Sequence, residues 1–244
     1  MKVSIVTVCY NSEVTIEDTI KSIASQTYND IEHIIIDGLS TDRTNKIIEE
    51  YSEIVSIYIS EKDSGLYDAM NKGISLATGD VVGILNSDDV LADETVIDKI
   101  VKGFDDKSID AVYSDLIYVS QYDLNKPSRY YSSKVFSKGL IRFGLMLPHP
   151  TFYVRKKYYE KLGLYKTNYR VAADFELLTR FIFSGLKLRR LPFVSVKMRE
   201  GGVSSSGLLW RVHQNLEIVR ACHENGLYTN IFLIVSNNLL AKNL

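Results

Sequence analysis

The stretch VSIVTVCYNSEVTIEDTIKSIASQTYNDIEHIIID, residues 3–37, contains the pattern that decides the fold. Its two ends, residues 3–9 and 31–37, are almost continuous runs of apolar and β-branched residues, which are typical of strands covered on both faces. Between them, apolar residues recur near helical spacing behind Ser12, a good N-cap residue. A strand, a helix and a second strand in this order predict a parallel pair with the helix packed on the sheet.

The same alternation continues to about residue 100. Apolar runs recur at residues 55–60 and 80–85, and segments of helical character that begin near residues 40 and 66 alternate with them. This order predicts an α/β protein with a doubly wound, mostly parallel, Rossmann-like sheet flanked by helices.

Beyond residue 100 the pattern is less regular. The later segments predict one or two strands at 110–120, a polar loop at 125–134, a strand and a short helix at 148–163, a helix at 172–185, a strand and a Gly/Ser loop at 188–207, and an amphipathic helix at 208–226. We therefore expect a smaller and more irregular second region that ends in helices.

The composition is that of an ordinary globular protein. The 244 residues carry a formal net charge of −1, so no basic surface is available to hold nucleic acid. The cysteines, Cys9 and Cys222, form no metal-type spacing, and free thiols favour a reducing compartment. We expect no signal peptide and no spanning helix, since no apolar run reaches the roughly 18 residues that a span needs. These features predict a cytoplasmic protein.

The tail of the chain, residues 228–244, is its most hydrophobic segment. Two interpretations fit it: a helix of the core, or an interfacial anchor that makes peripheral contact with the inner face of the membrane. Its weak basic face favours the core helix.

Polar residues follow each of the four N-terminal runs. They are Tyr10, Asn11, Asp37, Glu61, Lys62, Asp63, Asn86, Ser87, Asp88 and Asp89. If the strands are parallel, these residues share one edge of the sheet, where open α/β sheets bind ligands. The alternative is that polar residues simply begin loops. Asp88 and Asp89 repel each other and are costly to desolvate, so water, a helix N-terminus or a divalent cation should compensate them.

Missing motifs narrow the possible chemistry. The first strand is followed neither by Gly-x-Gly-x-x-Gly nor by a P-loop, which argues against dinucleotide dehydrogenases and P-loop NTPases. It is not followed directly by the aspartates of a haloacid-type phosphatase, nor by the Gly/Arg/Lys-rich loop of a nucleotidyltransferase.

Four segments in this order resemble the successive motifs of family-2 glycosyltransferases, which have the GT-A fold: VSIVTVCYNSEVTIEDTIKSIASQT, IIIDGLSTDRT, DAMNKGISLATGDVVGILNSDD and YRVAADFELLTR. The resemblance covers roughly residues 2–200. It implies that a sugar moves, with inversion, from a nucleotide diphosphate sugar, with a UDP-sugar as the expected donor, to a hydroxyl of a glycan or lipid-linked acceptor. Mn²⁺ or Mg²⁺ is the implied cofactor.

The resemblance also implies a division of the chain. Residues 1–200 form the glycosyltransferase domain, with a nucleotide-sugar-binding half at 1–100 and an acceptor-binding half at 101–200. Residues 201–244 form a C-terminal helical extension packed on the domain. Two other functions stay open: a non-catalytic nucleotide- or sugar-binding module of the same fold, and a sugar nucleotidyltransferase.

Asn86-Ser87-Asp88 falls on the Asp-x-Asp element of the family, and Asp88 matches its metal-binding aspartate. Divalent cations of this kind prefer oxygen ligands and are commonly held by one or two carboxylates plus substrate phosphates. Asn86 replaces the first aspartate, which leaves it a contact to the ribose. Asp89 either assists the metal through water or caps a helix that starts near Asp93.

Further residues of the donor site follow from the same match. Asp37 matches the aspartate that accepts hydrogen bonds from the base, although the usual Asp-Asp-Gly-Ser is here Asp-Gly-Leu-Ser. Thr7, Tyr10 and Asn11 are expected to line the nucleotide pocket. Asp63 lies where the third strand of the family meets the nucleotide, and its alternative role is that of a turn residue.

Asp174 matches the general base of the family. An inverting displacement needs one carboxylate to take the proton of the acceptor hydroxyl. Asp174 also stands where a helix begins, so a cap or a first-turn acid is the alternative. His149 and the REGGVSSS loop, residues 199–206, are candidates for contact with the acceptor or the diphosphate, with a structural role as the alternative for His149.

Overall fold

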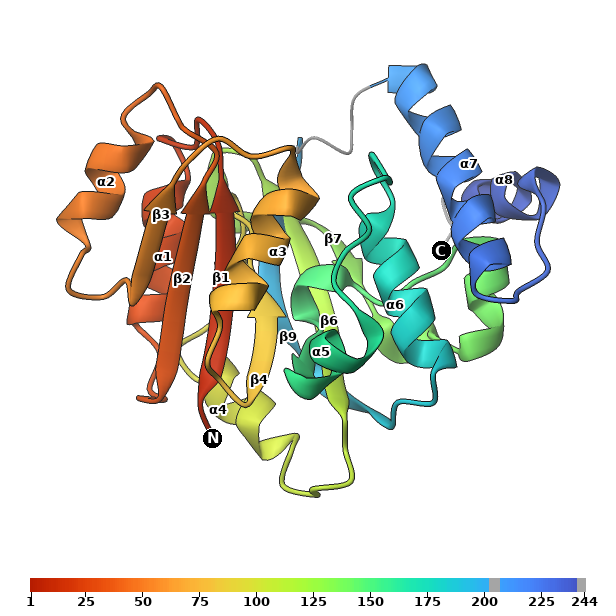
Figure 1. Ribbon diagram of the computed structural model, residues 1–244, viewed down its shortest axis with the longest axis horizontal. Coiled ribbons are helices and arrows are strands. Elements are labelled where there is room, and N and C mark those ends of the chain that lie inside the picture. Colours follow the sequence, from red (N-terminus) through yellow and green to blue (C-terminus); the bar gives the residue numbers. More distant parts are fainter. Residues whose placement is uncertain (202–206, 241–244) are drawn as a thin grey trace.

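The computed structural model describes residues 1–201 and 207–240 (Figure 1). Nine strands form one sheet in the order β3-β2-β1-β4-β8-β6-β9-β5, with β7 paired to β6. The strands are β1 Val3–Cys9, β2 Ile31–Asp37, β3 Ile57–Ser60, β4 Val81–Ile84, β5 Val90–Leu91, β6 Ala111–Ser120, β7 Asp123–Tyr131, β8 Tyr153–Arg155 and β9 Leu188–Arg199.

Helices cover this sheet and extend beyond it. They are α1 Ile16–Ala24, α2 Thr44–Glu50, α3 Leu66–Leu76, α4 Val96–Lys102, α5 Lys157–Leu162, α6 Ala173–Phe183, α7 Gly207–Glu224 and α8 Ile231–Leu240, with short 3₁₀ turns at Ser133–Val135, Lys138–Phe143 and His149–Thr151. Figure 1 shows α2 at one end of the molecule and α7 with α8 at the other.

The N-terminal strands β1 to β4 are all parallel, as the sequence predicts. Alternate residues of β2 face opposite layers, because side chains of a strand alternate between its faces. Ile34 and Ile36 pack in the core that α3 covers, whereas Ile35 packs with Ile16 of α1 and Ile48 of α2. Both faces of the sheet are therefore buried, and the predicted doubly wound arrangement is confirmed.

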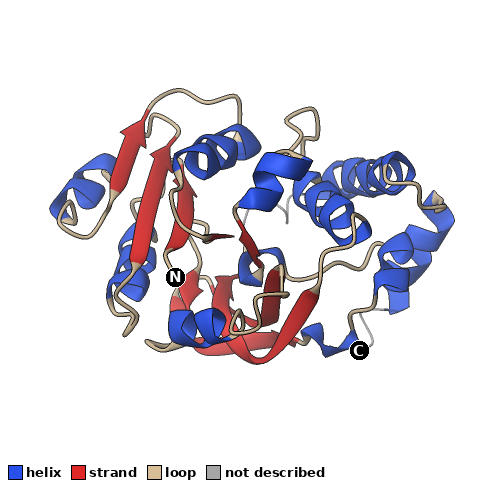
Figure 2. Ribbon diagram, turned by 60° about the horizontal axis from the view of Figure 1, so that its bottom comes forward, coloured by secondary structure: helices blue, strands red, loops and turns tan. Residues whose placement is uncertain are grey.

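The second half of the sheet is mixed. Strand β8 runs antiparallel to β4 and β6, and β9 runs parallel to β6 but antiparallel to β5. Figure 2 shows these strands curving away from the parallel set. Strand β5 belongs to the predicted half at residues 1–100, and its partner β9 belongs to the half at residues 101–200. One continuous sheet therefore joins the two predicted halves.

The polar loop predicted at residues 125–134 is wrong, because most of it is β7. This strand pairs antiparallel with β6 through Tyr118↔Arg129 and Val119↔Pro127, with irregular register around Val119. Nearly all of its side chains are exposed. An edge strand that is polar on its exposed faces lacks the apolar alternation by which strands are usually recognised, and Pro is tolerated there.

The C-terminal helices pack on α6 and on the 3₁₀ turn at Lys138–Phe143. Ile218, Cys222 and Ile234 are buried in the same core as α6. Phe232 of α8 is 81% exposed. The tail thus has the predicted core contact through Ile234. Among the described helices, none is long and apolar enough to cross a membrane.

Close contact between β4 and β8 requires a glycine at position 83. Gly83 pairs with Tyr153, and a Cβ atom at Gly83 would lie 2.3 Å from the buried Tyr153 ring. We expect Gly83→Ala to lower the free energy of unfolding by about 1–3 kcal/mol, the usual cost of overpacking. Urea denaturation measures this, with Gly139→Ala as control because a Cβ at Gly139 meets nothing within 4 Å. Equal stability of the two variants would contradict the prediction.

Candidate active site

The carboxyl ends of β1 to β4 lie at one edge of the sheet, the upper edge in Figure 1. Hydrogen bonds join the loops that leave these strands. The Asn11 N–H donates to Ser40 Oγ at 2.8 Å, the Thr41 N–H donates to Asn11 Oδ1 at 2.9 Å, and the Ser12 and Ser87 hydroxyls are 2.9 Å apart. The polar ends that are scattered in sequence therefore form one continuous rim.

Two residues of this rim have backbone conformations that L-residues rarely adopt. Asn11 has φ of 50° and Leu39 has φ of 67°. Asn tolerates the left-handed region, whereas Leu pays a steric cost there. Leu39 occupies the position of the glycine in the Asp-Asp-Gly-Ser motif and is 53% exposed. The strained turn keeps the conformation that a glycine would adopt freely.

Asp37 lies beneath the rim and is fully buried. Its Oδ2 accepts hydrogen bonds from the Ser40 N–H at 2.9 Å and the Ser60 hydroxyl at 2.6 Å, and its Oδ1 accepts from the Ser40 hydroxyl and, more weakly, the Cys9 thiol. A carboxylate offers about four acceptor sites, so these donors occupy Asp37 completely. It can contact a base only by releasing one of the two serines.

The other predicted donor residues differ in their access to solvent. Thr7 is fully buried, and its hydroxyl is hydrogen bonded to His33 Nε2 at 3.0 Å inside the sheet. Tyr10 is 63% exposed. A Cβ at Gly38 would lie 2.6 Å from Asp63 Oδ2 and 3.4 Å from the Tyr10 ring, so these three residues are neighbours. The structure therefore brings Tyr10 and Asp63 together at the open rim and leaves Thr7 below it.

Asp63 keeps one oxygen available at this corner. Its Oδ1 accepts the Gly65 N–H at 2.8 Å, which is the predicted turn contact. Its Oδ2 accepts no hydrogen bond from the part of the chain that the structure describes. Asp63 can thus serve the turn and still offer an acceptor to a ligand.

The loop after β4 brings together two carboxyl groups with few hydrogen-bond partners. Asp89 is fully buried, and neither of its carboxylate oxygens has a hydrogen-bond partner among the described residues; the same is true of Asn86 Oδ1. Burial raises the pKa of Asp88 and raises the pKa of Asp89 well above its usual range, with the Asp88 charge adding to the second shift. Asp88 itself is partly exposed and receives no hydrogen bond from another described residue.

Arg199, at the end of β9, is the cation whose charge acts on Asp88 and Asp89. It is 7% exposed, donates from Nη1 to the Asp88 backbone oxygen at 2.8 Å, and pairs through Nη2 with Asp18 at 2.5 Å. Its charge lowers the pKa of both aspartates against the effect of burial. Its Nη1 and Nη2 groups donate to the Asp88 backbone oxygen and to Asp18, and not to the carboxylate of Asp88 or Asp89. No side chain of the described residues donates to the carboxylates of Asp88 or Asp89, so a divalent cation could bind at Asp88 without displacing a partner.

Asp89 does not cap a helix, so that alternative is wrong. Neither oxygen of Asp89 accepts a hydrogen bond from a described residue, and α4 begins behind its N-cap residue Thr95, whose N–H donates to Asp93 Oδ1 at 2.8 Å. The partly exposed carboxylate of Asp88 suits an oxygen-ligated divalent cation, whereas Asp89 beside it in the chain is fully buried. No group of three or more His, Cys, Asp or Glu residues converges on a metal position within residues 1–201 and 207–240. The fit thus requires further ligands from a diphosphate and water.

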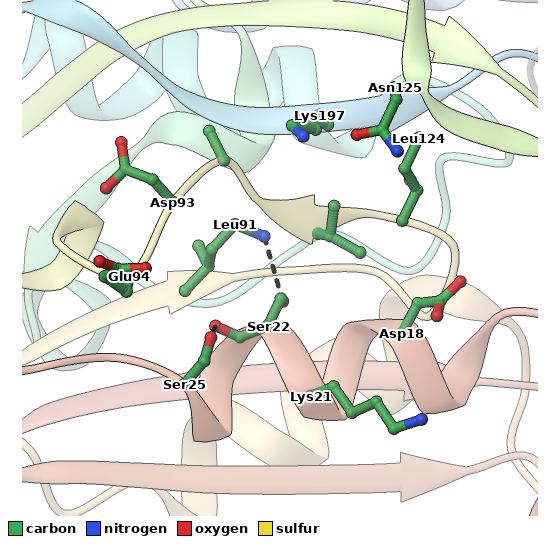
Figure 3. A pocket seen from close by; sticks show the side chains of 12 residues that line it. Asp18, Lys21, Ser22, Ser25, Leu91, Asp93, Glu94, Leu124, Asn125 and Lys197 are labelled. Atoms are coloured by element: carbon green, nitrogen blue, oxygen red, sulfur yellow. Dashed lines mark hydrogen bonds between the residues drawn. The ribbon is translucent and has the colours of Figure 1, made fainter.

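Figure 3 shows a groove of about 450 Å³ between α1, β5, the start of β7 and β9. Its walls include Asp18, Ser22, Asn125 and Lys197, and the Ser22 hydroxyl accepts the Leu91 N–H at 3.1 Å. None of the predicted site residues lines this groove. Asp18, which lines this groove, forms an ion pair with Arg199, the residue that donates to the Asp88 backbone oxygen.

Asp174 lies in the first turn of α6 and is partly exposed. Its Oδ1 accepts the Phe175 N–H at 2.8 Å and a long hydrogen bond from the Tyr67 hydroxyl at 3.4 Å. Burial raises the pKa of Asp174, and His149 opposes this shift. Tyr67 belongs to the first turn of α3, directly after the Asp63 corner. The start of α3 therefore connects the nucleotide rim to the candidate base.

The other titratable groups near Asp174 are engaged in structure. Glu176 is fully buried between Arg180, at 3.0 Å, and Lys166, at 2.8 Å, and their hydrogen bonds hold its pKa low despite its burial. His149 is buried with Nε2 hydrogen bonded to the Tyr165 hydroxyl at 2.6 Å, and burial lowers its pKa. Residues 202–206 of the predicted Gly/Ser loop lie outside the described residues.

The parallel strand ends, the acidic loop after β4 and the carboxylate at the start of α6 are features of a glycosyltransferase. The chain belongs to the family described as "Glycosyl transferase family 2", whose model matches residues 4–172. The resemblance noted in the sequence is thereby confirmed.

Relatives of this chain carry glycosyltransferase names. It is 29% identical, over 83% of its length and 79% of the relative's, to a "PGL/p-HBAD biosynthesis glycosyltransferase" of Mycobacterium bovis. It is 31% identical, over 73% of its length and 68% of the relative's, to an uncharacterized glycosyltransferase of Mycobacterium tuberculosis. A shorter match, 39% identical over 36% of each chain, is to the "Putative teichuronic acid biosynthesis glycosyltransferase TuaG" of Bacillus subtilis.

Solved structures share the fold at low identity. TarS 1–349 of S. aureus in complex with UDP superposes with a TM-score of 0.73 at 18% identity, covering 92% of this chain and 65% of that one. The mannosyltransferase PcManGT of Pyrobaculum calidifontis, in complex with GDP-Man and Mn²⁺, superposes with a TM-score of 0.67 at 19% identity, covering 91% and 63%. The predicted GT-A fold is confirmed by these likenesses.

Proposed function

We propose that this protein is an inverting, divalent-cation-dependent glycosyltransferase that moves a sugar from a nucleoside diphosphate sugar, with a UDP-sugar preferred, to a hydroxyl of a glycan or a lipid-linked acceptor. The observation that carries the proposal is the pairing of two carboxylates with different surroundings. Asp88 lies in the loop after β4, next to Asp89, whose carboxylate oxygens have no partner among the described residues. Asp174 lies in the first turn of α6, where it accepts a hydrogen bond from Tyr67 at the start of α3. The neighbours solved with UDP or with GDP-Man and Mn²⁺ support it.

On the donor side, this chain offers Tyr10 as an exposed aromatic face and Asp63 as an acceptor for the nucleoside. Asp88 would hold the cation, with the buried Asp89 beside it in the chain. A divalent cation bound there would offset the negative charge that develops on the departing nucleoside diphosphate.

On the acceptor side, Asp174 receives a proton. The acceptor oxygen forms a bond to the anomeric carbon, the bond between that carbon and the diphosphate oxygen breaks, and the hydroxyl proton moves to Asp174. Oδ1 of Asp174 is already engaged, and its Oδ2 accepts no hydrogen bond from another residue in the described ranges. Attack from the face opposite the diphosphate inverts the configuration of the anomeric carbon.

The identity of the donor is open to a direct test. We expect a UDP-sugar with Mn²⁺ to raise the melting temperature most in a panel of UDP-, GDP- and dTDP-sugars, and to release its nucleoside diphosphate in the presence of an acceptor. Stabilisation by a GDP- or dTDP-sugar alone would change the donor but keep the reaction. Formation of a nucleotide sugar from a nucleoside triphosphate and a sugar phosphate would replace the proposal by a nucleotidyltransferase.

Asp37 and Asp63 should respond differently to substitution. Asp63→Ala is expected to weaken binding of UDP by about 1.5–3 kcal/mol, the value of a hydrogen bond to a charged group, and to lower stability only through the loss of its exposed contact to the Gly65 N–H. Asp37→Ala leaves its serine partners unpaired and should lower the free energy of unfolding by about 1–3 kcal/mol, with weaker UDP binding as a consequence of the altered rim.

Titration calorimetry with UDP and urea denaturation of both variants make the comparison. If Asp37→Ala lost UDP affinity at full stability while Asp63→Ala bound UDP normally, the contact to the base would belong to Asp37. The prediction that Asp37 acts by holding Ser40 and Ser60 in the rim would then be wrong.

A further inference from the structure

The loop before Asp174 is held by a residue of the C-terminal segment. The carboxylate of Glu217, on α7, accepts three consecutive backbone N–H groups: those of Arg170 at 2.7 Å, Val171 at 2.8 Å and Ala172 at 2.8 Å. Ala172 is the N-cap residue of α6, and its side chain cannot cap the helix. Glu217 therefore places a negative charge at the positive end of the helix that carries the candidate base.

The same loop is held from the other side by α3. The Tyr67 hydroxyl donates to the Val171 backbone oxygen at 2.5 Å, so Val171 is fixed through its N–H by α7 and through its carbonyl by α3. The same hydroxyl lies 3.4 Å from Asp174 Oδ1. A displacement of this loop would thus change the position of the carboxylate as well as its hydrogen bond.

The residues that follow Glu217 on α7 are buried in the protein core. The next residue, Ile218, is 7% exposed and packs in the core that contains Phe181 of α6. Further along α7, Ala221 and Cys222 are fully buried in the same core. The carboxylate is therefore anchored to the protein interior, and its three acceptor contacts can resist movement of the loop.

We infer that Glu217 is a positioning residue for the base: it fixes the residue 170–172 loop so that Asp174 meets the acceptor hydroxyl. This inference rests on the proposed function. It makes α7 a part of the catalytic unit, since the segment beyond residue 200 supplies contacts that the base needs. The hydrogen bonds of Glu217 go to the residue 170–172 loop and not to the candidate donor residues at the ends of β1 to β4, so its effect should fall on the transfer step alone.

The test compares Glu217→Ala and Glu217→Gln in the full chain. We expect Glu217→Ala to lower kcat by about 10- to 100-fold, the size of effect that a small misplacement of a catalytic group produces. The KM for donor and the affinity for UDP with Mn²⁺ should stay within about twofold of wild type. Glu217→Gln keeps one acceptor oxygen, so its kcat should lie between those of wild type and Glu217→Ala. Amide hydrogen exchange of residues 170–172 should be faster in both variants.

Glu224→Gln is the matched control on the same helix. Glu224 pairs with side chains, Lys166 and Arg220, and not with the loop. It should change stability without lowering kcat. If Glu217→Ala does not fold, Glu217→Gln decides, because faster exchange at residues 170–172 with wild-type kcat would overturn the inference.

The outcome also separates this inference from the proposed function. Wild-type protein that releases no nucleoside diphosphate from any UDP-, GDP- or dTDP-sugar of the panel would overturn the proposed function and the inference with it. Transfer by wild type and an equal kcat in folded Glu217→Ala would overturn the inference alone.

Discussion

Asp174→Asn is expected to lower the rate of sugar transfer by about 10²–10⁴-fold, the usual contribution of a positioned general base. The amide keeps the size of the side chain and the oxygen that accepts the Phe175 N–H, so stability should change little. Donor binding should persist, since the proposed donor residues lie at the ends of β1 to β4. Single-turnover transfer with the acceptor, run beside UDP titration on the same variant, measures both quantities.

The pH dependence of transfer gives a second reading of the same residue. A base must be deprotonated to act, and burial raises the pKa of Asp174. Transfer by wild type should therefore fall as pH falls through this raised pKa, and the step should be absent in Asp174→Asn. A variant that binds UDP and transfers at the wild-type rate would refute Asp174 as the base. The groups left to test would then be Glu176, which is paired with Arg180 and Lys166, and His149, which is hydrogen bonded to Tyr165.

Asp88→Ala should abolish the dependence of nucleotide binding on Mn²⁺ while leaving the fold intact. The side chain is partly exposed at the rim and makes no hydrogen bond to another described residue, so its removal costs the core nothing. Asp89, enclosed and without partners, is left as a poor substitute ligand. Calorimetric titration of UDP with and without Mn²⁺ should show a gain in affinity for wild type and none for the variant.

Glu94→Ala provides the control for this experiment. Glu94 is an exposed acid shortly after the same loop, and its side chain contributes no contact to the site. It should bind UDP with the full Mn²⁺ dependence of wild type. Undiminished Mn²⁺ dependence in Asp88→Ala would show that the cation is held elsewhere.

The sequence was sufficient to predict the parallel half of the fold. Strands β1, β2 and β4 are buried and the edge strand β3 is half-buried, so each appears in the sequence as an apolar run. The helices between them show apolar residues at helical spacing. Parallel pairing then brings the strand ends to one edge without further information. This is why Tyr10, Asp63 and Asp88 could be placed at a common rim, and why the family motifs could be recognised in order.

Only the tertiary structure showed which rim residues remain available to a ligand. Asp37 looks like a free acid in sequence, yet Ser60, from the next strand, takes up one of its acceptor sites. Asp89 looks like a second ligand, yet it is enclosed. Strand β7 reads as a loop because an edge strand is stabilised by its backbone ladder to β6 and not by apolar side chains.

The contacts that hold the candidate base are the clearest case. Tyr67 and Asp174 are 107 residues apart, Arg199 and Asp88 are 111 apart, and Glu217 is 45 to 47 residues from the backbone groups it accepts. A backbone N–H carries no mark in the sequence of the carboxylate that will bind it. The sequence of α7 does not distinguish Glu217 from Glu224, the second acid on that helix. Periodicity encodes which face of an element is buried, but the partner of each polar group is chosen only when the elements pack together.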